Sequence, residues 1–270
     1  MSSSCLRAPV VVNSMEVATG RACRPYDVHS IRKHGFFMII DLHVHTSWGG
    51  YDSALSPKDV VEEALKIKLD GVCLTEHNTS WDRLKLQELV DGSGLVLMRG
   101  IEVDTEMGHI LAYGLDHYTS GIYRTADLRR EIDKVGGFLV AAHPFRRLFA
   151  EPGTFWGAIE QNTFSLEEAR KKPIFQITDE IEVLNGGCTT RENLCAFQVA
   201  RALGKRGVGG SDAHSNRGLG KFTTVLEKRI NNEQELLAEL RAGRFFPASR
   251  EPNGDLLPYA GLDHDQAGKQ

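Results

Sequence analysis

Cysteine is scarce in this chain, and its pattern argues against a disulfide framework. The five cysteines are odd in number, no two are spaced as Cys-x-x-Cys, and two of them lie in an N-terminal segment without strand or helix periodicity. Free thiols in a reducing compartment fit this pattern better than structural disulfides do. We therefore expect a cytoplasmic location.

Long hydrophobic runs and an excess of positive charge are also absent. No apolar run approaches the roughly 20 residues that a membrane-spanning helix needs. The formal net charge of −4 argues against a dedicated nucleic-acid-binding surface, although it allows a local basic pocket. We expect no membrane association and no stable binding of duplex nucleic acid. The sequence leaves the oligomeric state open.

The remaining composition is that of a globular protein, with 41% hydrophobic and 25% charged residues in 270. That length suits one α/β barrel. Residues 1–37 lack periodicity and are expected to form a disordered or loosely docked extension, with Met38 as an alternative start of the folded unit. The folded domain is predicted to cover residues 38–250, and residues 251–270, rich in Gly, Pro and Asp, are predicted to be a tail.

The most informative motif follows Met38, where an apolar run of strand-forming residues leads into two histidines separated by one valine. Side chains two positions apart in a strand leave on the same face, so His43 and His45 would stand side by side. Leu42 and Val44 would then point into the packing. Two imidazoles at the end of a strand suit one divalent cation, although the motif alone also allows an ordinary pair of strand histidines.

Strand and helix patterns alternate after this motif, which predicts a parallel sheet. A helix is expected after the N-cap and proline pair Ser56–Pro57, and another after the capping box that begins at Thr189. Polar residues recur at the C-terminal ends of the predicted strands, the edge where parallel-sheet enzymes place their chemistry. These residues are His43, His45, His77, Glu102, His143, Glu182, Asn185, Asp212 and His214.

The later strand ends supply residues that suit the same site. Asp212 and His214 repeat the spacing of two, among residues too small to form a core there. Glu102 follows an apolar strand where no helix pattern begins, so its carboxylate is a candidate bridge between metal ions. His143 precedes Pro144, which favours an extended backbone at the histidine.

Other candidates are placed less firmly by sequence. By alternation only one of Glu76 and His77 should face the site, and we assign His77, with Glu76 orienting it from behind. His109 follows a possible turn that could leave its ring in solvent. Asp52, in the glycine-rich loop after the first strand, could reach back as an oxygen ligand or remain an exposed loop residue.

The sequence does not decide the roles of two further pairs of residues. Glu182 and Asn185 compete for one position at their strand end, and the sequence does not separate them. Arg146 and Arg217 follow two of the candidate ligand motifs, where guanidinium groups would suit a substrate phosphate. Surface arginines are common, so each alone is also compatible with an ordinary solvent-exposed role.

Together these motifs resemble the PHP (polymerase and histidinol phosphatase) domain family, of the stand-alone metal-dependent phosphoesterase type. The resemblance covers about residues 38–248. It is carried by Asp41-Leu42-His43-Val44-His45-Thr46, Thr75-Glu76-His77-Asn78, Gly100-Ile101-Glu102, Ala142-His143-Pro144 and Gly210-Ser211-Asp212-Ala213-His214.

The resemblance implies a distorted (β/α)7, TIM-like barrel with parallel strands and a metal site at their C-terminal ends. It implies two or three divalent metal ions, commonly Zn, Mn or Fe. The first ion would be held by His43, His45, Glu102 and Asp212, with Glu102 bridging to a second. The second ion would be held by Glu102, His143 and His109, and the third by Asp52, His77 and His214. The connection between Glu102 and His143 is short and lacks the large cap of some nucleotide-acting relatives, so the resemblance does not by itself carry their substrates over to this chain.

The function expected from these residues is hydrolysis of a phosphate ester by metal-activated water. The substrate would be a small phosphate monoester, or the phosphate of a nucleotide or short oligonucleotide. Metal ions would lower the pKa of a bound water and neutralise charge on the phosphoryl oxygens. Glu102 would bridge, and His214 or His77 would protonate the leaving oxygen.

Two alternatives remain. An amidohydrolase-like metal hydrolase also uses His-x-His on its first strand, but it needs a mid-barrel lysine that the strands ending at Glu102, His143 and Glu182 do not offer. A non-catalytic metal-binding regulatory module would keep the fold without the chemistry, and elemental analysis of the protein would distinguish it.

Overall fold

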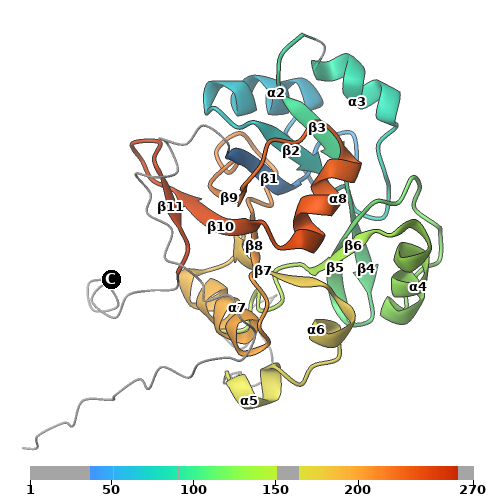
Figure 1. Ribbon diagram of the computed structural model, residues 1–270, viewed down its shortest axis with the longest axis vertical. Coiled ribbons are helices and arrows are strands. Elements are labelled where there is room, and N and C mark those ends of the chain that lie inside the picture. Colours follow the sequence, from blue (N-terminus) through green and yellow to red (C-terminus); the bar gives the residue numbers. More distant parts are fainter. Residues whose placement is uncertain (1–36, 51, 91, 151–163, 261–270) are drawn as a thin grey trace, which may run out of the picture.

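The chain has a mixed α/β fold in a computed structural model that describes residues 37–50, 52–90, 92–150 and 164–260 (Figure 1). One sheet has the strand order β11-β10-β9-β1-β2-β3, and the other has the order β4-β5-β6-β7-β8. The strands of the first sheet are β1 (Met38–Val44), β2 (Gly71–Leu74), β3 (Val96–Arg99), β9 (Phe222–Leu226), β10 (Phe245–Arg250) and β11 (Leu256–Pro258). Those of the second are β4 (Ile101–Thr105), β5 (Gly108–Tyr113), β6 (Phe138–Ala141), β7 (Glu180–Asn185) and β8 (Val208–Gly210).

The helices begin where the local sequence supplies caps. The predicted helix after Ser56 is confirmed, since Ser56 and Asp59 form a reciprocal capping box. The one after Thr189 is confirmed in the same way, with Glu192 as the partner. The described helices are α2 (Pro57–Lys66), α3 (Arg83–Val90), α4 (Thr125–Val135), α5 (Leu166–Ala169), α6 (Ile174–Ile177), α7 (Thr190–Ala202) and α8 (Glu233–Ala242).

The expectation of a parallel sheet is correct for only part of the structure. β1, β2 and β3 run parallel to one another, and so do β6, β7 and β8. β5 is antiparallel to both β4 and β6, because the two-residue turn between β4 and β5 makes a hairpin. β9, β10 and β11 are antiparallel as well, so the fully parallel arrangement was wrong.

The two sheets meet at two places beside the strand ends that carry the candidate ligands. A parallel bridge pairs Val44 with Ala213, and another pairs His77 with Glu102. The first joins the end of β1 to the segment after β8, and the second joins the segment after β2 to β4. Hydrogen bonds between Gly209 of β8 and Thr224 of β9 also cross between the sheets, and the observed fold is a mixed α/β fold with parallel strands.

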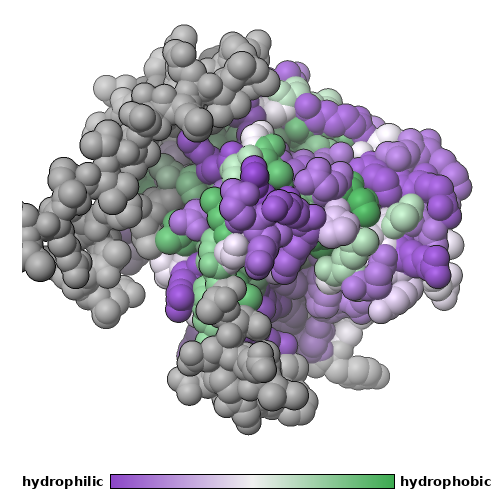
Figure 2. Space-filling view, turned by 90° about the horizontal axis from the view of Figure 1, so that it is seen from below, coloured by the Kyte–Doolittle hydropathy of each residue, from purple (hydrophilic) through white to green (hydrophobic). Residues whose placement is uncertain are grey.

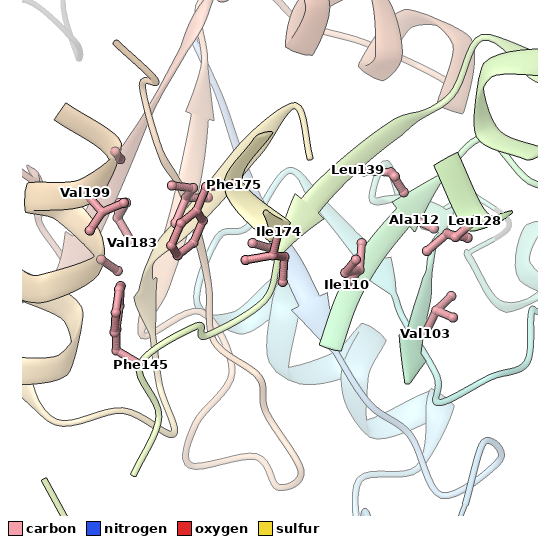
Figure 3. Packing of buried hydrophobic residues seen from close by; sticks show 14 of the residues in the cluster. Val103, Ile110, Ala112, Leu128, Leu139, Phe145, Ile174, Phe175, Val183 and Val199 are labelled. Carbon is pink, nitrogen blue, oxygen red and sulfur yellow. The ribbon is translucent and has the colours of Figure 1, made fainter. Parts of the chain in front are cut away.

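Apolar side chains fill both faces of the second sheet. Its outer face packs against α4, α6 and α7, and Figure 3 shows Ile110 and Ala112 of β5 beside Val103 and Leu128. A second cluster runs from the other face of this sheet to the first sheet and α8. Its members include Leu42, Leu111, Val140, Leu237 and Phe245. These clusters hold the strands that carry the polar ends, so the site is built on a rigid frame.

The segment after residue 250 is not only a tail, because β11 pairs with the edge strand β10. Its three residues are too few for the strand pattern to be read from sequence. The proposed extension before Phe37 and the last ten residues of the predicted tail lie outside the described residues.

Hydrophilic residues cover most of the described surface visible in Figure 2, with a narrow hydrophobic band between them. The large apolar side chains that are exposed in the described residues come from several elements, among them Leu65 on α2, Leu84 on α3 and Leu257 on β11. Of the helices in the described part of the chain, none has the length and apolar character needed to cross a membrane.

Candidate metal centre

The nine predicted ligand side chains come together in one cluster. Strands β1, β6 and the β7–β8 pair deliver their residues from C-terminal ends, as expected for a parallel arrangement. His109 instead enters from the start of β5. Because β5 runs antiparallel to β6, its start lies beside the end of β6, and the Ala142 N–H donates to the His109 carbonyl. The ring of His109 therefore reaches the site, although the sequence had left it uncertain.

The centre of the cluster is a group of four buried ligand atoms: His43 Nε2, His45 Nε2, Glu102 Oε2 and Asp212 Oδ1. The two imidazole nitrogens are 3.0 Å apart. Glu102 Oε2 lies 3.3 and 3.1 Å from them, and Asp212 Oδ1 lies 3.5 and 3.3 Å from them. Four ligands at bond lengths of about 2.0–2.1 Å around a tetrahedral ion are about 3.3 Å apart. The residues present therefore fit a divalent metal ion.

The second oxygen of Glu102 faces a different pair of histidines. Glu102 Oε1 is 2.7 Å from His109 Nδ1 and 2.8 Å from His143 Nε2. One carboxylate thus presents each of its oxygens to a separate set of imidazoles, which is the arrangement of a bridge between two metal ions. This is the role that the resemblance implied for Glu102.

A third group lies at the more exposed side of the cluster. Asp52 Oδ2 is 3.4 Å from Nε2 of both His77 and His214, and these rings stack on His45. The side chains of His77 and His214 are about one third exposed. Asp52 therefore reaches toward these two rings while its side chain remains 46% exposed.

The charges of the cluster favour a cation at its centre. Burial disfavours a charged imidazole, yet the Glu182 and Glu102 carboxylates outweigh that cost and raise the pKa of His43 to about 10. Burial also opposes ionisation of Glu102, but the histidines around it hold the pKa of its carboxyl well below its usual value. Burial lowers the pKa values of His77, His143 and His214, which favours the neutral imidazole that ligates metals.

Glu182 and Asn185 do not compete for one position, because each has its own partners. Glu182 Oε1 lies 3.0 Å from His43 Nδ1, the nitrogen that faces away from the cluster. Its Oε2 accepts from the His143 backbone N–H at 2.8 Å and from the Asn185 amide at 2.9 Å. Glu182 therefore sets the orientation and tautomer of His43 from behind.

Arg146 contacts a candidate ligand rather than standing apart to receive substrate. Its Nη2 donates to Asp212 Oδ2 and to Asn185 Oδ1. The two oxygens of Asp212 are thus divided, with Oδ1 toward the histidines and Oδ2 toward the guanidinium. Arg217 is exposed in the turn that follows His214.

Two local expectations were wrong. Glu76 does not orient His77, because its carboxylate accepts from the backbone and hydroxyl of Thr46 and from Trp81 Nε1, so it holds the loop after β1. His143 is not extended before Pro144, since its φ is +29°. The backbone turns sharply there, and the His143 N–H points at Glu182.

Two residues beside the cluster were missed by sequence reasoning. Asp41 is a fully buried residue of β1 and accepts from the backbone N–H groups of His43, Ser211 and Gly220, which ties β1 to the segment after β8. Asp104 follows Glu102 by two positions and lies near His77 and His109. The same spacing rule that selected His43 and His45 could have found Asp104.

Comparison with known families agrees with this arrangement. The PHP domain model matches residues 41–170, and the PHP-associated model matches residues 190–245. The chain belongs to the PHP domain family. Of the nine predicted ligands, Asp212 and His214 lie in the second matched segment and the other seven lie in the first, so both segments form the site.

Curated relatives match shorter segments. An error-prone DNA polymerase from Cutibacterium acnes is 31% identical over 81 residues, which are 30% of this chain but 7% of that polymerase. An uncharacterized protein of Methanocaldococcus jannaschii, MJ1587, is 26% identical over 117 residues, which are 40% of this chain and 68% of that protein. The chain therefore spans only a small part of the polymerase.

Solved structures share the fold at low identity. PsfC from Pseudomonas syringae has a TM-score of 0.52 at 19% identity, covering 75% of this chain and 88% of its own. A proposed metal-dependent phosphoesterase from Bifidobacterium adolescentis has a TM-score of 0.51 at 17% identity, and the match covers 75% of this chain and 95% of that protein. An amidohydrolase from Chromobacterium violaceum with bound sulfate and no metal has a TM-score of 0.53 at 17% identity, covering 76% and 96%.

Proposed function

We propose that this protein is a metal-dependent phosphoesterase that hydrolyses a small phosphate monoester, or the phosphate of a nucleotide or short oligonucleotide, with water. Membership of the PHP family supports a metal-dependent hydrolase. The finer assignment rests on one observation: a buried carboxylate, Glu102, presents its two oxygens to two separate sets of histidines.

We assign two or three divalent ions, of Zn, Mn or Fe, to the three groups of ligand atoms. Divalent ions bound there supply Lewis acidity toward a phosphoryl oxygen and lower the pKa of a water molecule. The mixed set of imidazoles and carboxylates suits all three metals. The residues assigned to hold the ions are His43, His45, Asp52, His77, Glu102, His109, His143, Asp212 and His214.

The other roles in the proposed reaction would fall to acidic, histidine and arginine side chains of the protein. Glu102 and Asp212 are fully or nearly buried, and their negative charges hold the centre together. His77 and His214 lie at the more exposed side, where a leaving group would reach solvent. We assign protonation of the leaving oxygen to one of them, and because a ring that holds a metal ion is a poor acid, the proton would come from a ring that is not bound to metal. Arg146 donates to Asp212, one of the four central ligands, and we propose that the guanidinium groups of Arg146 and Arg217 bind the substrate phosphate.

An amidohydrolase-like reaction is less well supported by the residues. That chemistry expects a lysine on a middle strand beside the metal ligands, and β4, β6 and β7, which lead to Glu102, His143 and Glu182, contain none. The Lys205 ammonium on the connection to β8 instead donates to the carbonyls of Thr178 and Asp179. In the PHP site the bridging carboxylate comes from Glu102 itself.

We also propose that the two sheets close into the distorted (β/α)7 barrel that the resemblance implies. The bridges between Val44 and Ala213 and between His77 and Glu102 support this, since they join the sheets at both margins of the cluster. We retain residues 38–250 as the catalytic unit, with an extension before it and a tail after it. The cytoplasmic location remains a prediction.

The test compares phosphatase activity of the metal-loaded wild type with that of His43→Ala and Asp212→Ala. Both substitutions remove a corner of the four-atom group, so we expect each to lower kcat/KM at least 100-fold and to lower the metal content of the purified protein. His117→Ala is the matched control, because His117 is an exposed histidine outside the ligand groups. Equal activity in all four proteins would refute the assignment.

A substrate comparison would then narrow the reaction. Histidinol phosphate, mononucleotides and short oligonucleotides should be offered to the same metal-loaded protein beside an amide or lactam substrate. Turnover of any phosphate ester with loss in His43→Ala supports the proposal. Turnover of the amide alone would favour the amidohydrolase reaction, and bound metal without turnover of any substrate would favour a regulatory module.

A further inference from the structure

Asp104 lies between two of the assigned metal ligands without belonging to the set that the family resemblance names. It follows Glu102 by two positions on β4, so both carboxylates leave the same face of the strand. In the hairpin, Asp104 is the direct cross-strand partner of His109. Its Oδ1 is 3.4 Å from His109 Nε2 and 3.6 Å from His77 Nδ1.

The two rings present different nitrogens to Asp104. His109 Nδ1 faces Glu102 at 2.7 Å, which leaves Nε2 toward Asp104. His77 Nε2 faces Asp52 at 3.4 Å, and its Nδ1 lies 3.4 Å from Glu102 Oε2 and 3.6 Å from Asp104 Oδ1. One oxygen of Asp104 therefore lies near a nitrogen of each of two histidines that we assign to different metal ions.

Asn78 holds Asp104 in this position. The Asn78 amide donates to Asp104 Oδ2 at 2.7 Å, and its Oδ1 accepts from the Asp104 backbone N–H at 3.0 Å. Asn78 itself is in the left-handed region, with φ of +49°, a conformation that asparagine adopts more readily than most residues. The contact fixes a side chain that is 50% exposed and that would otherwise rotate freely in solvent.

We infer that Asp104 is a positioning residue that accepts from the N–H groups at His77 Nδ1 and His109 Nε2. It thereby couples the second and third metal positions, which we call the outer ions. This rests on the proposed metal cluster. A carboxylate behind a ligating histidine selects the tautomer with its free electron pair toward the metal and makes that nitrogen a stronger ligand. The distances of 3.4 and 3.6 Å from Asp104 Oδ1 to the two rings are longer than the hydrogen-bonding range of about 2.7–3.2 Å, so the rings would have to approach Asp104 when ions are bound.

The test measures metal binding to the full chain without substrate. Wild type, Asp104→Ala and Asp104→Asn are stripped with a chelator and titrated with Zn²⁺ and Mn²⁺, and the dissociation constants and the number of ions per chain at saturation are recorded. Asp133→Asn is the matched control, because Asp133 is an exposed carboxylate on α4 that pairs with Arg129. Circular dichroism and thermal melting of each protein establish that it is folded.

We expect Asp104→Ala to raise the dissociation constants of the outer ions about 10- to 100-fold, while the number of ions bound at saturation is unchanged. Asn78→Ala should change the same dissociation constants in the same direction by a smaller factor, because it releases Asp104 without removing it. Asp133→Asn should bind as the wild type does.

Two results would overturn the inference. Wild-type affinity in Asp104→Ala would mean that the carboxylate does not act on the two rings. Loss of one whole ion at saturation would mean that Asp104 is itself a ligand of an outer cation with His77 and His109. Neither result would refute the proposed hydrolysis of a phosphate ester. That proposal is refuted separately if the metal-loaded wild type hydrolyses no phosphate ester.

Discussion

Replacement of Glu182 by glutamine tests how the cluster selects the tautomer of His43. Glu182 is fully buried and meets three groups: His43 Nδ1, the His143 backbone N–H and the Asn185 amide. The carboxylate accepts from all three, so His43 carries its proton on Nδ1 and turns the free electron pair of Nε2 toward the metal position. A glutamine of the same shape cannot accept from all three.

The tautomer that the Glu182→Gln variant imposes follows from counting donors. The new amide oxygen would face the backbone N–H of His143 and the side chain of Asn185, since both are donors. The amide NH₂ would then face His43 Nδ1 and donate to it, which moves the imidazole proton to Nε2. That proton occupies the nitrogen that should ligate the metal, and turning the amide over would place its NH₂ against two donors.

The expected effect is a loss of metal affinity at the position of His43 and His45. Removing the partner behind a ligating histidine costs about 10- to 100-fold in affinity, or about 1.4–2.7 kcal/mol. The assay is titration of the stripped protein with Zn²⁺ against a competing chelator. Nitrogen NMR of the His43 ring in the same samples reports which nitrogen carries the proton.

A control on the same strand separates the tautomer effect from lost stability. Glu180 is also a buried carboxylate on β7, and it accepts from the backbone N–H groups of Arg206 and Gly207, away from the ligands. Glu180→Gln should lower the free energy of unfolding by about 1–3 kcal/mol and leave metal affinity unchanged. Wild-type metal affinity in Glu182→Gln, with the proton still on Nδ1, would refute the reasoning.

Three further outcomes are expected. Burial raises the pKa of Asp41 from 3.8 to about 6, so this group stabilises the folded state below pH 3.8 and loses about 3 kcal/mol of that contribution as the pH rises to 6. The free energies of unfolding of wild type and Asp41→Asn in urea should therefore diverge with rising pH, in favour of the variant, by up to that amount. A difference that stays constant with pH would contradict the shift. Gly210→Ala would place a methyl carbon 2.5 Å from His43 Cβ, which should cost about 1–3 kcal/mol in the free energy of unfolding and lower metal affinity, whereas unchanged binding would mean that the strand shifts freely. Chelation of the bound ions should lower the melting temperature by about 8–16 °C if they are present at about 1,000 times their dissociation constants, and an unchanged melting curve would argue against ions bound in the native state.

Local sequence determined much of the secondary structure because its signals lie within a few residues. The capping boxes that begin α2 and α7 are formed by side chains three positions apart, and the left-handed glycine that ends α4 is Gly136. The spacing of two in His43-Val44-His45 is a property of any strand. These features need no knowledge of distant segments, and the helix starts after Ser56 and Thr189 were predicted correctly.

The direction of a strand depends on which neighbour it pairs with, and that was decided by tertiary structure. The apolar pattern of β5 is the same in a parallel or an antiparallel sheet, so the sequence did not reveal the hairpin with β4. The strands β10 and β11 depend in the same way on an available sheet edge. The observed two-sheet order therefore departs from the regular parallel arrangement.

Residue chemistry selected the candidate ligands, since histidine and carboxylate side chains at strand ends are recognisable without coordinates. Only the tertiary structure assigns a role to each of them, because the roles depend on distances between residues far apart in the sequence. Glu182 and His43 are 139 positions apart and meet at 3.0 Å, and Arg146 reaches Asp212 across 66 positions. The sequence thus determined which groups are available to hold metal, and the tertiary structure decided which nitrogen or oxygen of each group faces the centre.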